Sequence, residues 1–258
     1  MNDEQSNKFP IPERLSLKGR NALVVGAASG IGRATARCFA ELGAEVILAD
    51  RSPLDIVRQE VEAAGSSATI LQGDVTDDAY LQRIIAGGPY YSFAYVAGVF
   101  RGPSGSTPKV SFDYVMHVNV FAPLVLGGGL IDKAEPKQGG YMVFVGSSAG
   151  RTGQGKIGHP DEYATYAASK GALHILARSL AARGAQKNIV VNAVAPGVVI
   201  TPMTDDTAPH LRNNPAVSPL GRGADPIELG WPIALLCTPA ASFASGAVLD
   251  VNGGAVVA

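Results

Sequence analysis

The feature that most limits the possible folds of this chain is a regular alternation of short apolar runs with segments of helical periodicity. The first run is Asn21–Val25 (NALVV), and a helical pattern follows at residues 31–42. Further runs of this kind, most of them separated by helical segments, lie at residues 44–49, 68–71, 93–97, 141–145, 188–194 and 247–251. Strands that alternate with helices predict parallel βαβ units. We therefore predict an α/β fold built on one doubly wound parallel sheet of about seven strands.

The chain shows no linker and no internal repeat, and 47% of its residues are apolar, which is enough for one large core. We assign residues 17–258 to a single domain. Residues 1–16 are polar and charged and lack the apolar stretch of a signal peptide, so we expect a flexible N-terminal leader. We find no unbroken apolar run of bilayer length and expect a cytoplasmic protein without a membrane partner.

Charge and cysteine content exclude several classes of function. The net charge is −1, so the chain lacks the basic excess that suits a phosphate backbone, and we expect no nucleic-acid partner. The two cysteines, Cys38 and Cys237, are too few and too far apart in sequence for a disulfide framework or a metal site. We therefore predict no bound metal.

A glycine-rich turn, Gly26-Ala-Ala-Ser-Gly30-Ile-Gly32, joins the first strand to the first helix. Its spacing, G-x-x-x-G-x-G, differs from the G-x-G-x-x-G dinucleotide fingerprint, but the physical effect is the same. A backbone without Cβ atoms lets a pyrophosphate approach the amides at a helix N-terminus. A plain tight turn remains the alternative reading of the glycines alone.

Asp50 ends the second predicted strand, about 20 positions beyond the glycine turn. A carboxylate there can accept hydrogen bonds from a ribose diol and would repel a 2′-phosphate. Ser29, inside the glycine turn, is not basic, so both residues favour NAD over NADP. Arg51 argues mildly for NADP, because a guanidinium can bind a phosphate. Asp74 either contacts an adenine amino group or is a turn residue, and the sequence favours neither.

Residues 166–170 (YAASK) place a tyrosine and a lysine one helical turn apart. A nearby ammonium favours the phenolate and lowers the tyrosine pKa from its reference of about 10, so the phenol can exchange a proton with an alcohol or carbonyl. Such a pair also occurs on ordinary exposed helix faces. Its context is a set of residues that end predicted strands, where open α/β sheets bind ligands: Gly26–Gly32, Asp50, Asp74, Gly98, Ser147 with Ser148, and Pro196 with Gly197.

Over roughly residues 17–257 the chain resembles the Rossmann-like short-chain dehydrogenase/reductase family. The resemblance is carried in order by Gly26/Gly30/Gly32, Asp74, Asn119, Ser147-Ser148, Tyr166 with Lys170, Pro196-Gly197 with Thr201, Pro219-Leu-Gly-Arg222, and Gly246 with Val251-Asn-Gly-Gly254. It implies hydride transfer between NAD(H) and a substrate. It also implies a homotetramer with the Tyr-bearing helix and the last strand at interfaces.

The resemblance implies a role for each matching residue. Tyr166 would be the general acid/base, and Lys170 would lower its pKa and hold the nicotinamide ribose. Asn119 would sit at a helix irregularity and help hold a water, and a serine would orient the substrate oxygen. Members usually use the second serine of such a pair, so we choose Ser148 over Ser147. The implied cofactor-binding residues are Gly26, Ser29, Gly30, Ile31, Gly32, Asp50, Arg51, Asp74, Val75, Ala97, Gly98, Tyr166, Lys170, Pro196, Gly197, Val199 and Thr201.

Three departures from the family pattern stand out. Val25 replaces the usual Thr or Ser before the first glycine, and Tyr95-Val-Ala-Gly98 replaces Asn-Asn-Ala-Gly. The segment between Ser148 and Tyr166 is longer than usual, and we expect the excess around residues 153–160 to form a loop at the substrate mouth. In it, Lys156 and His159 either select an anionic or polar substrate or are solvated loop residues. Further pocket candidates are Phe100, Arg101 and Met203.

The leading hypothesis is an NAD-dependent oxidoreductase that acts on a secondary alcohol or its ketone. Alternatives are a 3-oxoacyl-thioester reductase, against which Asp50 argues because such reductases favour NADPH, and a sugar, polyol or cyclic-diol dehydrogenase. A non-catalytic dinucleotide-binding protein is a further class. The presence of Asn119, Ser148, Tyr166 and Lys170 together argues against that class.

Overall fold

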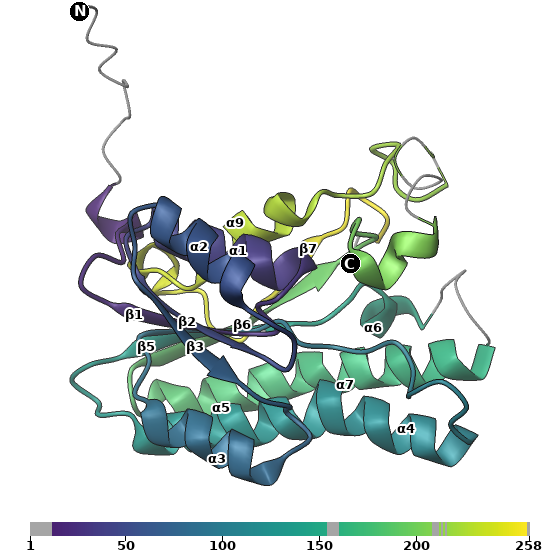
Figure 1. Cartoon of the computed structure of the whole chain (residues 1–258), viewed down its shortest axis with the longest axis horizontal. Helices are drawn as coiled ribbons and strands as arrows, with labels where there is room; N and C mark the ends of the chain where they lie inside the picture. The colour runs from purple at the N-terminus through teal and green to yellow at the C-terminus, as the bar shows by residue number, and fades with distance from the viewer. Residues whose placement is uncertain (1–11, 154–159, 208–211, 213, 215, 257–258) are drawn as a thin grey trace, which may run out of the picture.

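Seven parallel strands form one central sheet with helices on both faces (Figure 1). The structure is a computed structural model that describes residues 12–153, 160–207, 212, 214 and 216–256. The strands are β1 (Asn21–Val25), β2 (Glu45–Asp50), β3 (Ala68–Gln72), β4 (Ser92–Tyr95), β5 (Gly140–Val145), β6 (Ile189–Pro196) and β7 (Val248–Val251). Their spatial order is β3-β2-β1-β4-β5-β6-β7, which confirms the predicted doubly wound sheet.

The pleat of each strand divides its side chains between two hydrophobic cores. In β1, Ala22 and Val24 belong to one core, whereas Leu23 and Val25 belong to the other. The first core lies beneath α1 (Gly30–Glu41), α2 (Asp55–Ala63) and α9 (Pro226–Leu236). The second lies beneath α3 (Asp78–Gly87), α5 (Ala122–Lys133) and α7 (Pro160–Ala185). Two shorter helices, α4 (Pro108–Met116) and α6 (Ala149–Thr152), adjoin the second group (Figure 1).

Strand β1 pairs with β2 on one side and with β4 on the other. The chain therefore leaves β1 in two opposite directions across the sheet, and a crevice opens at the carboxyl ends of β1 and β4. Backbone hydrogen bonds close the bottom of this crevice: Gly26 N–H donates to Ala49 at 2.8 Å, and Ala97 N–H donates to Val25 at 2.9 Å. The predicted cofactor residues after these strands are consequently neighbours in space.

A π-helical turn, His117–Phe121, interrupts the helical stretch between α4 and α5. Pro123 explains the interruption. It lies in the first turn of α5 and has no N–H, so the regular hydrogen-bond ladder cannot continue. The Ala122 N–H instead reaches back five residues to the His117 carbonyl.

The stretch Pro108–Lys133 is long and apolar enough, by those two measures alone, to cross a membrane. Pro123 and the glycines at 127–129 interrupt it, so it is not an unbroken apolar run, in keeping with the expectation from the sequence. Within the fold, 56% of its apolar window is buried against the rest of the protein, which is the pattern of a core helix beneath a sheet.

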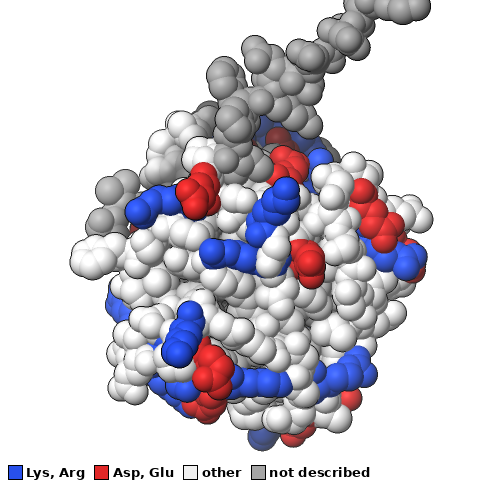
Figure 2. All heavy atoms as spheres, turned by 90° about the vertical axis from the view of Figure 1, so that its left-hand side faces the viewer, with Lys and Arg blue, Asp and Glu red and all other residues white. Residues whose placement is uncertain are grey.

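Part of the expected N-terminal leader has defined structure. Glu13–Leu15 forms a 3₁₀ turn, and Leu15 packs against the first core. The leader expectation therefore does not hold for these three residues, and residues 1–11 lie outside the described part of the chain. Figure 2 shows the molecule from the left-hand side of Figure 1. Basic and acidic side chains are mixed on that face, with uncharged surface between them.

Candidate active site

The glycine turn after β1 packs too tightly for any other residue at two positions. A Cβ on Gly26, whose φ is +89°, would lie 2.5 Å from the Ala97 nitrogen, and one on Gly32 would lie 1.8 Å from the Gly26 carbonyl oxygen. The turn delivers the chain to α1, where Ser29 is the N-cap residue but makes no side-chain cap hydrogen bond. The first-turn amides of α1 therefore remain available to an anion, and the turn fits a pyrophosphate.

Asp50 ends β2 beside this turn, as predicted. Its carboxylate accepts hydrogen bonds from the Ala28 N–H at 3.0 Å and the Ser52 N–H at 2.9 Å. Each carboxylate oxygen keeps a further lone pair, so both remain able to accept from a ribose diol. Asp50 thus also ties the middle of the glycine turn to the end of β2.

Arg51 and Asp74 lie next to each other at the edge of the crevice. Asp74 accepts two hydrogen bonds from Thr76, both at 2.9 Å, and its other oxygen lies 3.6 Å from the Arg51 guanidinium. Arg51 also donates to the Tyr114 hydroxyl of α4 at 2.8 Å. Despite partial burial, the Thr76 hydrogen bonds and Arg51 lower the pKa of Asp74, so the carboxylate is charged at neutral pH. Asp74 therefore combines the turn role and a place at the crevice.

The loop after β6 closes the other side of the crevice. A Cβ on Gly197 would lie 2.9 Å from the Asn252 Cα, and one on Gly30 would lie 3.0 Å from the Thr201 methyl group. Thr201 therefore rests against the glycine turn, and Val199, which is buried, pairs with Ala224. The remaining predicted cofactor residues, Ile31, Val75, Ala97, Gly98 and Pro196, line the same edge of the sheet or pack behind it.

Tyr166 and Lys170 lie one turn apart on α7, below the carboxyl end of β5. The Lys170 ammonium is buried and donates to the Val145 carbonyl at 2.8 Å, and it lies 5.8 Å from the centroid of the Tyr166 ring. A Cβ on Gly98 would meet the same ammonium at 3.0 Å, so Gly98 leaves the space that Lys170 occupies. Burial lowers the pKa of Lys170 to about 8.

The expectation that Lys170 depresses the Tyr166 pKa is not met. Burial raises the pKa of Tyr166, and the hydrogen bond with Ser147 opposes that rise. The physical reason is that the ammonium is directed to the Val145 carbonyl, while the phenol is partly enclosed by aromatic rings.

The geometry favours Ser147 over Ser148, the predicted choice, as the substrate-orienting serine. The Ser147 side chain, not that of Ser148, lies close enough to Tyr166 to act on the pKa of its phenol. The Ser148 N–H donates to the Pro196 carbonyl of β6 at 2.8 Å, and this bond orients the turn so that the preceding side chain points inward. Ser147 is buried, whereas Ser148 is partly exposed at the start of α6.

Asn119 lies in the π-helical turn, at the predicted helix irregularity, and is completely buried. Its side-chain amide donates to the Val99 carbonyl and accepts from the Val99 N–H, both at 2.9 Å, and it also donates to the Ser169 hydroxyl at 2.9 Å. The side chain therefore clamps the loop after β4 onto α7. Both amide hydrogens and one lone pair of the amide oxygen are engaged with protein atoms, and the expected role of Asn119 in holding a water stays a prediction.

Several residues at the site escaped the sequence reasoning. His174 continues the four-residue spacing of Tyr166 and Lys170 and is only 5% exposed, and that spacing was a usable signal. Arg151 donates to Asp250 and to the Val248 carbonyl, both at 2.8 Å, and joins α6 to β7. These contacts join segments about 100 residues apart and leave no local pattern.

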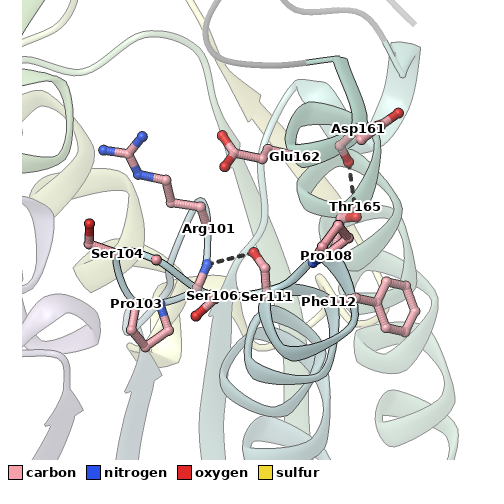
Figure 3. A pocket seen from close by; sticks show the side chains of 12 residues that line it. Arg101, Pro103, Ser104, Ser106, Pro108, Ser111, Phe112, Asp161, Glu162 and Thr165 are labelled. Atoms are coloured by element: carbon pink, nitrogen blue, oxygen red, sulfur yellow. Dashed lines mark hydrogen bonds between the residues drawn. The ribbon is translucent and has the colours of Figure 1, made fainter.

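An aromatic cluster covers the Tyr166 ring. The Phe100 ring centroid lies 5.1 Å from that of Tyr166 and 6.0 Å from that of Tyr163. Next to Phe100, Arg101 lines a cavity of about 440 Å³ between the loop after β4, α4 and the start of α7 (Figure 3). Met203 is exposed, and Lys156 and His159 lie outside the described residues.

The cavity next to Phe100 has a polar lining. Figure 3 shows the Glu162 side chain extending from α7 toward the loop that carries Arg101. Hydroxyl groups of Ser104, Ser106, Ser111 and Thr165 complete much of the lining. Within the described residues no cluster of three or more His, Cys, Asp or Glu side chains suited to a metal ion occurs.

Comparison with known proteins assigns the chain to a family. A family profile described as Enoyl-(Acyl carrier protein) reductase matches residues 26–256. Galactitol 2-dehydrogenase (L-tagatose-forming) from Cereibacter sphaeroides is 34% identical, over 93% of this chain and 96% of that protein. The chain belongs to the short-chain dehydrogenase/reductase family. It is an oxidoreductase that acts on CH–OH groups.

Solved structures agree with this fold. A 7α-hydroxysteroid dehydrogenase in complex with NADH and 7-oxo glycochenodeoxycholic acid has a TM-score of 0.82 and 28% identity, covering 96% of this chain and 98% of that one. RhlG from Pseudomonas aeruginosa, in an active-site complex with NADP, has a TM-score of 0.81 and 26% identity, covering 95% and 99%. The two structures hold different nicotinamide cofactors, so the choice between NAD and NADP rests on this chain's own residues.

Proposed function

We propose that this protein is an NAD-dependent dehydrogenase that interconverts a secondary alcohol of a polyol with the corresponding ketone. The observation that carries the proposal is the position of Tyr166 beside both Ser147 and the buried Lys170 ammonium, which lies one helical turn away. A phenol, a hydroxyl and a buried ammonium at one strand end can hold a substrate oxygen and move its proton.

Each residue has a distinct task in this mechanism. In the oxidation direction, Tyr166 accepts the proton of the substrate hydroxyl, and Ser147 donates a hydrogen bond that stabilises negative charge on the reacting oxygens. Lys170 supplies a fixed positive charge beside the phenol and, from its position behind Gly98, would hold the nicotinamide ribose. A bound nicotinamide cofactor accepts or supplies the hydride. In the reduction direction Tyr166 returns the proton.

NAD is the cofactor that the adenosine side of the crevice favours. Asp50 places a negative charge beside the glycine turn, where it would accept from a ribose diol and repel a 2′-phosphate. The cation that might offset it, Arg51, is held by the Tyr114 hydroxyl and lies near Asp74. The proposed binding residues are those predicted from the sequence, including Ser29, Ile31, Val75, Ala97, Pro196, Gly197, Val199 and Thr201.

A neutral polyhydroxylated substrate suits the cavity beside Phe100. Its lining includes the Arg101 guanidinium, the Glu162 carboxylate and several hydroxyl groups. The Glu162 carboxylate would repel an anionic substrate, whereas substrate hydroxyl groups can donate to it and accept from the guanidinium. The galactitol dehydrogenase relative supports the same substrate class.

Reduction of a 3-oxoacyl thioester, the alternative within this family, would need space for an apolar acyl chain and is expected to use NADPH. The polar lining of the cavity and Asp50 both weigh against it.

We further propose a homotetramer, as the family resemblance implies. Large apolar side chains are exposed on two separate faces. The first group consists of Phe121 in the π turn, Leu124 on α5 and Ile175 on α7. The second consists of Trp231 and Leu235 on α9 and Leu249 on the edge strand β7. Each group includes one element expected at an interface: the Tyr-bearing helix α7 in the first group and the last strand β7 in the second. A cytoplasmic location is proposed on the two free, buried cysteines, which suit a reducing compartment.

The central experiment measures NAD⁺ reduction at 340 nm with galactitol, other polyols, D-gluconate and simple secondary alcohols, and acetoacetyl-CoA reduction with NADPH and NADH. We expect turnover of polyols with NAD⁺ and its loss in Tyr166→Phe. Turnover that persists in Tyr166→Phe would disprove the mechanism, and faster turnover of acetoacetyl-CoA would favour the thioester reductase.

The polyol assignment has its own test. Glu162→Gln should raise KM for polyols without changing KM for NAD⁺, because it removes a cavity acceptor. Glu62→Gln, on the exposed face of α2, is the matched control and should leave both constants unchanged. A substrate panel in which D-gluconate is preferred, with Glu162→Gln improving its use, would contradict the charge argument.

A further inference from the structure

The side chain of His174 is a buried titratable group that the mechanism above does not use. Tyr166, Lys170 and His174 succeed one another at one-turn intervals on α7 and so lie along one stripe of the helix. Tyr166 and Lys170 meet the reacting end of the site, whereas His174 lies behind it, under the turn that ends β5.

Two contacts show what His174 supports. Its Nε2 accepts a hydrogen bond from the Ser147 backbone N–H at 3.4 Å. The imidazole also lies directly on Gly146, where a Cβ would be 2.1 Å from Nε2. The ring therefore fills the space left by the glycine and holds the amide of Ser147, whose side chain lies beside Tyr166.

The imidazole can accept this hydrogen bond only while it is neutral, with its proton on Nδ1. Its surroundings keep it neutral. Burial is the largest cause, because it disfavours the charged imidazolium. Positive charge from Arg151 on α6 and from Lys170 and Arg178 on α7 acts in the same direction, and Asp250 on β7 opposes it. These influences together lower the pKa of His174 to about 4.

We propose that His174 is a positioning residue that holds the Ser147 amide and thereby aims the Ser147 hydroxyl at Tyr166. The inference rests on the proposed function, because it assigns Ser147 to the reacting site. Other constraints on Ser147 are local: its hydroxyl accepts from the Ala149 N–H at 3.2 Å, and its carbonyl accepts from the Gly150 N–H at 3.0 Å. His174 supplies the hydrogen bond to Ser147 from a different element, and so sets where the turn lies relative to α7.

The test compares His174→Leu with His174→Gln. Leucine fills the cavity but cannot accept, whereas the glutamine amide oxygen can take the place of Nε2. We expect kcat to fall about 10- to 100-fold in His174→Leu, as for other small misplacements of a catalytic group. His174→Gln should recover most of that loss, and NADH affinity, measured by fluorescence titration, should be the same in both variants.

A double-mutant cycle separates positioning from general destabilisation. In a Ser147→Ala background there is no hydroxyl to aim, so His174→Leu should reduce the residual kcat little further. An equal fold-loss in both backgrounds, or equal losses in His174→Leu and His174→Gln, would overturn the inference. So would wild-type kcat in His174→Leu. If Tyr166→Phe is inactive while His174→Leu is normal, only this inference fails; an active Tyr166→Phe would instead disprove the proposed function.

Discussion

The Tyr95 hydroxyl donates a 2.6 Å hydrogen bond to the Val118 carbonyl and so fixes the end of β4 to the π-helical turn. The bond has a clear structural reason. The N–H that would extend the π pattern to Val118 belongs to Pro123, which has none, so the carbonyl lacks a helical partner. Tyr95 stands where the family usually has asparagine, and through this hydrogen bond it supports the neighbouring backbone.

Tyr95→Phe should therefore destabilise the protein. Removing the hydroxyl leaves the buried Val118 carbonyl without this donor, which costs about 1–3 kcal/mol. Urea unfolding followed by circular dichroism measures the loss. Tyr141→Phe on the neighbouring strand β5 is the control, because no hydrogen bond to its hydroxyl occurs among the described residues, and it should change stability much less. Equal stabilities for the two variants would contradict the support role.

The two serines after β5 can be separated by single substitutions. Ser147→Ala should reduce kcat about 10²- to 10³-fold, the typical effect of deleting a donor to developing negative charge. Ser148→Ala is the matched control and should stay close to wild type, because only its backbone takes part in the turn. Steady-state kinetics with NAD⁺ and a polyol checks both. A larger loss in Ser148→Ala would restore the original choice of that serine.

Asn119→Asp should be more harmful than its near-identical shape suggests. The new carboxylate oxygen would replace the amide donor and face the Val99 carbonyl, with loss of the hydrogen bond to Ser169. Leaving these groups unpaired around a buried charge costs about 1–3 kcal/mol or more. We expect a lower unfolding midpoint and weaker NADH binding, since the loop after β4 borders the crevice. Unchanged NADH affinity would show that the hydrogen bonds of Asn119 do not affect the cofactor site.

Asp50→Asn tests the cofactor choice. Losing the negative charge should raise kcat/KM for NADP⁺ relative to NAD⁺, because a 2′-phosphate is no longer repelled. The asparagine oxygen can still accept from the Ala28 N–H, so the glycine turn should keep its shape. Asp55→Asn, on the exposed start of α2, serves as the charge-matched control. If the ratio of kcat/KM for NADP⁺ to that for NAD⁺ is unchanged in Asp50→Asn, another residue sets the cofactor preference.

His174 also predicts how stability depends on pH. Its pKa falls from 6.5 to about 4 on folding, so the unfolded chain binds more protons in this interval and stability drops as the pH falls from 6.5 toward 4. This group alone would account for about 3 kcal/mol of that drop. Urea unfolding at pH 7 and pH 4.5 should show a smaller decrease for His174→Gln than for wild type. Identical decreases would contradict a buried, neutral imidazole.

Much of the fold was predictable because buried parallel strands have a local signature. β-branched runs that end at glycine or aspartate predicted β1 without error and β2 to within a residue at each end. The same logic placed the glycine turn, Asp50 and Asp74 at one edge of the sheet, since parallel strands finish on the same side.

What sequence reasoning missed depends on contacts between distant segments. The Ser148 N–H is bonded to the carbonyl of Pro196, far along the chain on β6, and this contact turns the Ser147 hydroxyl inward. The π turn had a local signal in Pro123, four residues after Asn119. The departure of the Tyr166 pKa from expectation follows from burial beside Phe100, which comes from the loop after β4, and beside Tyr163 on α7 itself.

The place of β1 between β2 and β4 has a consequence for cooperativity. A dinucleotide lying across that seam would touch loops from the first half of the chain, at Gly26 and Asp50, and from the second half, at Gly197 and Thr201. Neither half offers a complete binding surface, so ligand affinity would add to the free energy that holds the two halves together. A saturating cofactor should thus make the sheet unfold as a single unit at higher denaturant, and exchange of backbone amides on β3 and β7, at opposite edges, should slow in parallel.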